Sequence, residues 1–167
     1  MRSKRSVCWV IVCLIIMMTG PAYLLAQDSV KGKLLGTWRL ISIEAKKSSG
    51  EVAYWPFGKD PVGIIMYDKG RMCAQLMRPG RPAIGSHSPK DITVAFDGYI
   101  AYCGTYTIDE KEGTVTHHAT MSLIPEWVGG DQKRFYQFSG RFLVLKTPPI
   151  LDAGQTLVSW ITWERDD

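Results

Sequence analysis

The sequence predicts an all-β protein, an antiparallel up-and-down β-barrel of about eight to ten strands with one short helix. Segments rich in β-branched and aromatic residues alternate with turn signals along most of the 167-residue chain. Only one stretch, 88–98, has apolar residues at helical spacing. The first strand-like segment carries Trp38 and the last carries Arg165. A guanidinium above an indole would join the two ends of one sheet and close the barrel.

Residues 1–26 are expected to form a secretory signal peptide ahead of the barrel domain, residues 27–167. Three basic residues open the leader, the apolar run 7–18 follows, and a cleavage site is expected after Ala26. An uncleaved membrane anchor is the less favoured alternative, because a spanning helix needs about 20 apolar residues. We therefore expect a secreted or periplasmic protein.

Charge and cysteine usage limit the partners of the chain. The formal net charge of +4 belongs mostly to the leader, which holds three of the 20 basic residues and none of the 16 acidic ones. The rest is nearly neutral and has no basic run, which argues against a nucleic-acid partner or a polybasic membrane surface. Outside the leader remain Cys73 and Cys103. Export permits a disulfide between them, although two small buried thiols are the favoured interpretation.

The strands are delimited by turn residues in chain order. Asp68-Lys69-Gly70 predicts a tight hairpin turn. Pro89 and Gly98 predict the first residue and the end of the helix, with Ser88 as N-cap and Asp91 as its capping-box partner. A barrel of about eight strands encloses side chains or one small ligand, and the helix would cover or plug it. The predicted strands are 35–46, 52–55, 62–67, 71–77, 99–108, 114–124, 132–138, 141–146 and 155–165.

Several segments, taken in order, resemble the lipocalin-like domain family, small barrel proteins of the calycin group. The resemblance covers nearly all of the chain after the leader. It implies a barrel around a small, mostly apolar ligand. Some fungal barrels of similar shape look like cyclases or isomerases, so the resemblance leaves an enzymatic role open. The segments that carry it are LLGTWRL (34–40), YWPFGKDPVGIIMYDKGRM (54–72), QLMRPGRP (75–82), AFDGYIAYCGTYTID (95–109), VTHHATMSLIPEWVGGDQKRF (115–135), LKTPPI (145–150) and WERDD (163–167).

His117 is the first candidate for chemistry inside the barrel. Alternation along 114–124 places His117 and Met121 on the apolar inner face and His118 toward water. An imidazole in an apolar cavity could donate to a ligand or act as an acid or base. The favoured alternative is a core histidine that a neighbouring backbone group or tyrosine satisfies. We expect no metal site, because adjacent histidines face opposite ways and the cysteines lack metal spacing, and no cofactor.

Tyr102 and Tyr106 are expected to face inward with Gly104 between them. Two inward phenols beside a glycine would leave space and supply hydroxyl donors for an aromatic or carbonyl-bearing ligand. Ordinary barrel packing is an equally good explanation of the same pattern.

Three loops are candidates for the mouth of the barrel. Arg78 and Arg81 lie on a Pro/Gly loop that could attract a carboxylate or phosphate, or could be a solvated turn paired with surface acids. Trp55 and Trp127 lie on aromatic loops that could form a hydrophobic rim or close one barrel end.

The favoured function is binding of a small hydrophobic molecule inside the barrel, with Tyr102, Tyr106 and His117 orienting any polar group. The first alternative is an isomerase- or cyclase-type enzyme that uses His117 or Tyr102 as acid or base. The second is a cell-envelope interaction protein with a filled barrel. Gly36, Trp38 and Arg165 are assigned to barrel closure. The sequence leaves the ligand and the oligomeric state open.

Overall fold

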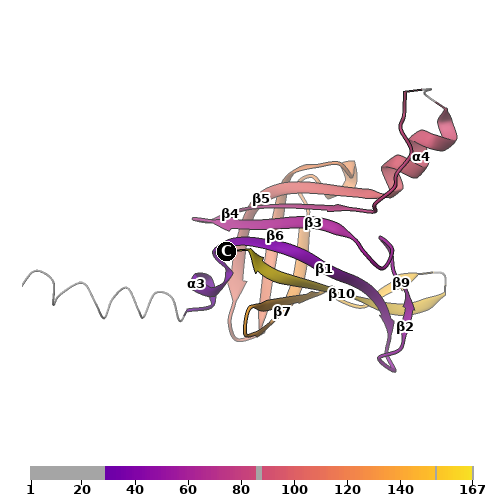
Figure 1. Ribbon diagram of the computed structural model, residues 1–167. Coiled ribbons are helices and arrows are strands. Elements are labelled where there is room, and N and C mark those ends of the chain that lie inside the picture. Colours follow the sequence, from indigo (N-terminus) through magenta and orange to yellow (C-terminus); the bar gives the residue numbers. More distant parts are fainter. Residues whose placement is uncertain (1–28, 86–87, 153, 167) are drawn as a thin grey trace, which may run out of the picture. The chain divides into compact units, whose positions relative to one another are not determined.

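The computed structural model describes residues 29–85, 88–152 and 154–166, so the predicted signal peptide lies outside the described residues. A short helix, α3 (Val30–Leu34), belongs to a separate compact unit from the barrel. The barrel unit contains helix α4 (Pro89–Asp97) and one turn of 3-10 helix, η1 (Pro125–Trp127) (Figure 1). Its strands are β1 (Gly36–Lys47), β2 (Val52–Tyr54), β3 (Val62–Asp68), β4 (Arg71–Met77), β5 (Tyr99–Asp109), β6 (Thr114–Ser122), β7 (Asp131–Ser139), β8 (Phe142–Lys146), β9 (Ile150–Asp152) and β10 (Gln155–Asp166).

The sheet closes on itself through its first and last long strands. β1 pairs with β10 antiparallel, from Thr37 opposite Asp166 to Lys47 opposite Leu157. β3 to β8 complete the ring in chain order, and the short strands β2 and β9 extend β1 and β10 at one end. The predicted all-β, closed antiparallel barrel with one short helix is confirmed, and β9 falls within a segment predicted to be a loop.

Side chains alternate between the barrel interior and its outer surface, as strand geometry requires. On β4, Met72, Ala74 and Leu76 are buried while Arg71 and Gln75 are exposed. Removing these apolar side chains from water is the main stabilising contribution, at about 25 cal/mol per Å². The largest fully buried apolar side chains of the barrel unit are Trp38, Trp163, Ile65, Met72, Leu143, Leu145 and Val115.

A β-bulge in β6 changes which residues face inward. The register shifts opposite Cys103 and Gly104, so Ala119 stays buried while Met121 is 62% exposed. The prediction that Met121 points into the barrel is therefore wrong, because the extra residue reverses the alternation. Gly104 allows the close approach: a Cβ there would lie 1.9 Å from the His118 carbonyl oxygen.

Cys73 and Cys103 lie opposite each other on β4 and β5, with their Cα atoms 4.1 Å apart, and form a disulfide. Both alternate with buried neighbours, so the bridge lies on the outer side of the barrel wall. The favoured interpretation of two unbonded, buried thiols is corrected, because the register brings the two side chains together on one face.

Helix α4 begins after Ser88 and ends before Gly98, as the sequence predicts, but Ser88 makes no side-chain capping hydrogen bond. None of its residues is buried, and the apolar side chains of Ile92 and Phe96 are exposed. Figure 1 shows α4 extending away from the strands between β4 and β5. The helix therefore does not plug the barrel, contrary to the expectation. Among the described residues, no helix is both long enough and apolar enough to cross a membrane.

The junction of β1 and β10 contains the three residues assigned to closure. Trp38 lies opposite Arg165, whose guanidinium carbon is 4.2 Å from the centre of an indole ring. Arg165 also donates to the Leu35 carbonyl oxygen at 2.8 Å. Gly36 has a φ of 116°, and a Cβ there would lie 3.0 Å from the Arg165 Nη1 atom. The glycine is thus needed for both its backbone conformation and the space it leaves.

Candidate ligand-binding cavity

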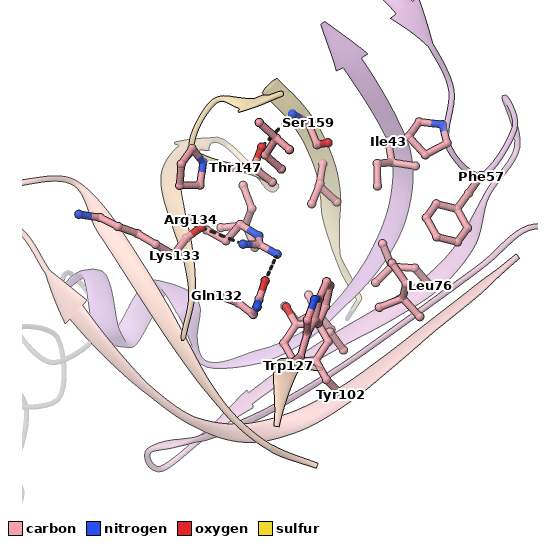
Figure 2. Close-up of a pocket in the computed structure, with 18 of the residues that line it drawn as sticks. Ile43, Phe57, Leu76, Tyr102, Trp127, Gln132, Lys133, Arg134, Thr147 and Ser159 are labelled. Carbon is pink, nitrogen blue, oxygen red and sulfur yellow. Dashed lines mark hydrogen bonds between the residues drawn. The ribbon is translucent and has the colours of Figure 1, made fainter. Parts of the chain in front are cut away.

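The barrel contains a partly open cavity of about 450 Å³, within the range of small-molecule sites. Residues from β1, β3, β4, β5, β7, β8 and β10 contribute to its wall, together with the segments around β2, η1 and β9 (Figure 2). The apolar residues that line it are Ile43, Pro56, Phe57, Ile65, Ala74, Leu76, Ile100, Leu145, Pro148, Ile150 and Ile161. The aromatic and polar ones are Tyr54, Tyr102, Trp127, Asp131, Gln132, Lys133, Arg134, Thr147, Ser159 and Trp163.

A buried histidine bridges two tyrosines beside this cavity. His117 is fully buried, with Nε2 at 2.7 Å from the Tyr67 hydroxyl and Nδ1 at 2.8 Å from the Tyr102 hydroxyl. Burial, and then the charge of Arg134, lowers the pKa of His117 to about 3. The imidazole is therefore neutral near pH 7, and both of its nitrogens are engaged. This agrees with the favoured alternative of a satisfied core histidine, and it leaves no free nitrogen for a base.

One of the two tyrosine hydroxyl protons in this bridge is not needed for a hydrogen bond to His117. A neutral imidazole has one N–H donor and one acceptor nitrogen, so one tyrosine donates to the ring and the other accepts from it. The accepting tyrosine keeps its own O–H to donate elsewhere. Tyr102 lines the cavity whereas Tyr67 does not. With the proton on Nδ1, the bridge therefore gives the cavity wall a hydroxyl donor at Tyr102.

Arg134 is a buried charged residue that lines the cavity. It lies on β7 opposite Val115, and its residue surface is only 8% exposed. Its Nη1 donates to the Lys133 carbonyl oxygen at 2.8 Å, and its Nη2 to Gln132 Oε1 at 3.5 Å. Figure 2 shows Arg134 and Gln132 directed into the cavity, while the Lys133 side chain points away from it.

No carboxylate pairs with Arg134 among the described residues. Asp131 also borders the cavity, but its side chain is largely exposed and lies 2.6 Å from His118 Nδ1 on the outer face. Trp163 has an indole N–H that is buried without a hydrogen-bond partner in the described part of the chain. The cavity therefore combines an apolar wall with an unpaired cation and unused donors.

Residues 35–166 match the family model described as a lipocalin-like domain. The chain belongs to the lipocalin-like domain family. A 4'-hydroxy-3'-methoxypropiophenone carrier protein of Aspergillus oryzae is 33% identical over 106 residues, which cover 56% of this chain and 96% of that protein. The crystal structure of a lipocalin-like protein from Bacteroides uniformis is similar with a TM-score of 0.43 and 14% identity, over 81% of this chain and all of that one.

Of the residues predicted to bind ligand in this lipocalin-like domain, Tyr102 and Trp127 line the cavity. Their rings pack edge to face with centres 5.4 Å apart. Tyr106 is buried on the same face as Tyr102 but does not line the cavity, and it packs edge to face against Tyr67 at 5.1 Å. His117 does not line the cavity itself, but its Nδ1 lies 2.8 Å from the hydroxyl of Tyr102, which does.

The predicted arginine mouth and one predicted aromatic rim residue lie elsewhere. Arg78 donates to the Pro56 carbonyl oxygen at 2.8 Å, and Arg81 donates to the Ala95 carbonyl oxygen at 2.9 Å beneath the Tyr99 ring. Neither arginine lines the cavity, and neither does Trp55, which contacts Lys59 instead. The three predicted residues thus lie outside the wall of this cavity, and both guanidinium groups donate to backbone carbonyl oxygens. Arg78 nevertheless positions Pro56, which does line the cavity.

The two short strands approach each other at one side of the cavity. The Tyr54 hydroxyl of β2 donates to Asp152 Oδ2 of β9 at 2.5 Å. This hydrogen bond raises the pKa of Tyr54 above its ordinary value. Tyr54 and Ile150 both line the cavity, so this contact fixes part of its rim.

Sequence reasoning left Arg134 and Gln132 without an orientation. Aromatic residues occur on both faces of β7, with Phe135 exposed and Tyr136 and Phe138 on the opposite face, so alternation within the strand was ambiguous. Pairing with β6 resolves it, because His117 lies opposite Gln132 and faces inward. A joint reading of the two strands could have placed Arg134 inside.

Proposed function

We propose that this lipocalin-like protein binds a small, mainly apolar molecule in the barrel cavity and acts as its carrier. The observation that carries the proposal is the cavity of about 450 Å³ with a largely apolar wall. The relative from Aspergillus oryzae supports it, because its name describes a carrier of a substituted aromatic ketone. The Tyr102 and Trp127 rings offer flat apolar surfaces to an aromatic body.

We also propose that the protein is secreted or periplasmic. The leader pattern of residues 1–26 and the Cys73–Cys103 disulfide support this, since disulfides persist in oxidising compartments. Cell fractionation followed by N-terminal sequencing tests it, and the expected mature chain begins at Gln27. Recovery of the chain from the cytoplasm with its leader intact would contradict this assignment.

Binding is tested with N-phenyl-1-naphthylamine, an uncharged aromatic probe whose fluorescence rises in apolar surroundings. We expect saturable binding of one probe per protein and displacement by 4'-hydroxy-3'-methoxypropiophenone. Native mass spectrometry of gently purified protein would show a co-purifying molecule directly.

A matched pair of variants locates the probe. Ala74→Phe adds a ring to the cavity wall and should weaken probe binding, whereas Ala101→Phe adds the same ring to the neighbouring strand on the alternate face. Equal binding by both variants, each shown to be folded by circular dichroism, would place the probe outside the cavity and contradict the proposal.

A further inference from the structure

We propose that the ligand of this cavity carries one anionic oxygen group, a carboxylate, sulfonate or ionised phenol, which pairs with Arg134. The inference rests on the proposed function and specifies the chemical class of its ligand. The expected molecule has an apolar body against the cavity wall and its negative charge at the β7 side.

The first step is the burial of the cation. Arg134 is 8% exposed. Arginine is almost never so buried without a partner, because an ion loses its hydration on leaving water. Arginine also keeps its charge in proteins, so it cannot escape this cost by losing a proton.

The second step is the hydrogen-bond inventory of the guanidinium. Its five N–H donors face two acceptors, the Lys133 carbonyl oxygen at 2.8 Å and Gln132 Oε1 at 3.5 Å. The second distance is at the limit of a hydrogen bond, and both acceptors are uncharged. The remaining donors and the full positive charge match an oxyanion, which can accept two parallel N–H bonds.

The third step is that carboxylates at the edge of the cavity, and one of its hydroxyl groups, are already hydrogen-bonded to groups other than Arg134. Asp131 is bonded to His118 on the outer face, and Asp152 accepts from Tyr54 at the rim. The Thr147 hydroxyl accepts from the Ser159 backbone N–H at 3.0 Å. Among the described residues that line the cavity, none thus supplies a charge that neutralises Arg134.

The fourth step is the presence of further donors in the same wall. The indole N–H of Trp163 is buried and has no hydrogen-bond partner among the described residues. With the His117 proton on Nδ1, the Tyr102 hydroxyl is also available to donate, and the Arg134 charge acts on Tyr102 by lowering a pKa that burial raises. Donors dominate the polar part of this cavity, so an acceptor group with negative charge complements it.

The test compares two probes with the same ring scaffold. 1-Anilinonaphthalene-8-sulfonate differs from N-phenyl-1-naphthylamine by a single sulfonate. The full chain should bind the sulfonate more tightly than the neutral probe. Arg134→Met should weaken sulfonate binding about 10- to 100-fold, the range for loss of charge-assisted hydrogen bonds, and change neutral-probe binding about twofold at most.

Arg71→Met is the matched control, since it also removes a guanidinium group, from an exposed position on β4 that does not line the cavity. It should leave both affinities unchanged. Arg134→Gln is the second variant, and it decides the matter if Arg134→Met does not fold. Circular dichroism and thermal unfolding confirm that each variant is native before titration, because the sulfonate probe also binds partly unfolded proteins.

The outcomes separate the two proposals. Loss of sulfonate binding with retained neutral-probe binding supports the inference. Equal affinities for the two probes, or equal losses in Arg134→Met and Arg71→Met, overturn the inference and leave the carrier function standing. Failure of the wild-type protein to bind either probe overturns both.

Discussion

Arg165 and Arg134 both lie on strands of the barrel. They differ in how far the surrounding residues satisfy the charge and the hydrogen-bond donors of the guanidinium group. Arg165 covers the Trp38 ring at 4.2 Å and donates to the Leu35 carbonyl oxygen. Arg134 is buried, yet its hydrogen-bond partners among the described residues are one backbone carbonyl and one distant amide oxygen. The first guanidinium is complementary to the protein around it. The second guanidinium has no charged partner among the described residues.

This difference separates an arginine that stabilises the fold from one that is available to a ligand. A charge whose partners are complete contributes to the folded state, whereas an unpaired buried charge lowers its stability. Such a charge is tolerated where a ligand offsets the cost, and binding sites commonly sacrifice stability in this way. The barrel junction and the cavity should therefore respond to substitution in opposite ways.

The largest effect is expected at the barrel junction. Trp38→Ala should lower the free energy of unfolding by about 3–5 kcal/mol, because Trp38 is fully buried and contacts both Arg165 and Phe138. Urea denaturation measures the loss. Trp160→Ala is the control, since Trp160 alternates with buried residues on β10 and contacts Lys46 and Lys146. Equal losses in the two variants would contradict the structural role of Trp38.

The second effect is a loss of stability in acid caused by His117. Burial lowers its folded-state pKa to about 3, below the ordinary 6.5, so the unfolded chain takes up the proton first. Stability contributed by neutral His117 is complete above pH 6.5 and falls as the pH drops toward 3. The slope should be about 1.4 kcal/mol per pH unit in this window. Urea denaturation at a series of pH values measures it.

Two glutamine variants isolate this effect. His117→Gln should remove the contribution of His117 to the acid slope. His118→Gln should retain the slope, because His118 lies on the outer face with Asp131 and Thr107. An unchanged slope in His117→Gln would assign the acid sensitivity to other groups and refute the prediction.

The barrel could be predicted from the sequence because the same local pattern recurs along its strands. Period-two alternation of apolar residues, interrupted by turn residues, predicts strands and their inner faces. The junction was predictable for the same reason, since the first and last strands each carry one large complementary group. Loop arginines followed no such rule. Arg78 and Arg81 reach backbone carbonyls whose positions only the folded chain defines.

The third effect contrasts the two arginines directly. Arg165→Met should lower the free energy of unfolding by about 1–2 kcal/mol through loss of the cation–π contact and the charged hydrogen bond. Arg134→Met should leave the ligand-free protein unchanged or stabilise it by about 1 kcal/mol, because it removes an unpaired buried charge. Urea denaturation of ligand-free protein measures both. A similar loss in both variants would make Arg134 a structural residue.

The sequence could not place residues beyond a bulge. One extra residue in β6 moves every later side chain to the other face, and nothing in the local pattern announces it. Because Met121 is apolar, the alternation predicted that it faces inward, although the bulge before it had already reversed the alternation. The signal that could have located the shift is Gly104 on the facing strand, where a Cβ would collide with the His118 carbonyl.

The smallest expected effect tests this reversal of the side-chain alternation in β6. Met121→Ala should alter the free energy of unfolding by no more than about 0.5 kcal/mol and leave neutral-probe affinity unchanged, because Met121 is largely exposed. Met72→Ala is the matched control, since Met72 is buried on β4 and its truncation should cost about 2–5 kcal/mol. Urea denaturation compares the two methionines. If Met121→Ala destabilises the barrel as much as Met72→Ala, then Met121 faces inward and the bulge does not shift the strand as described.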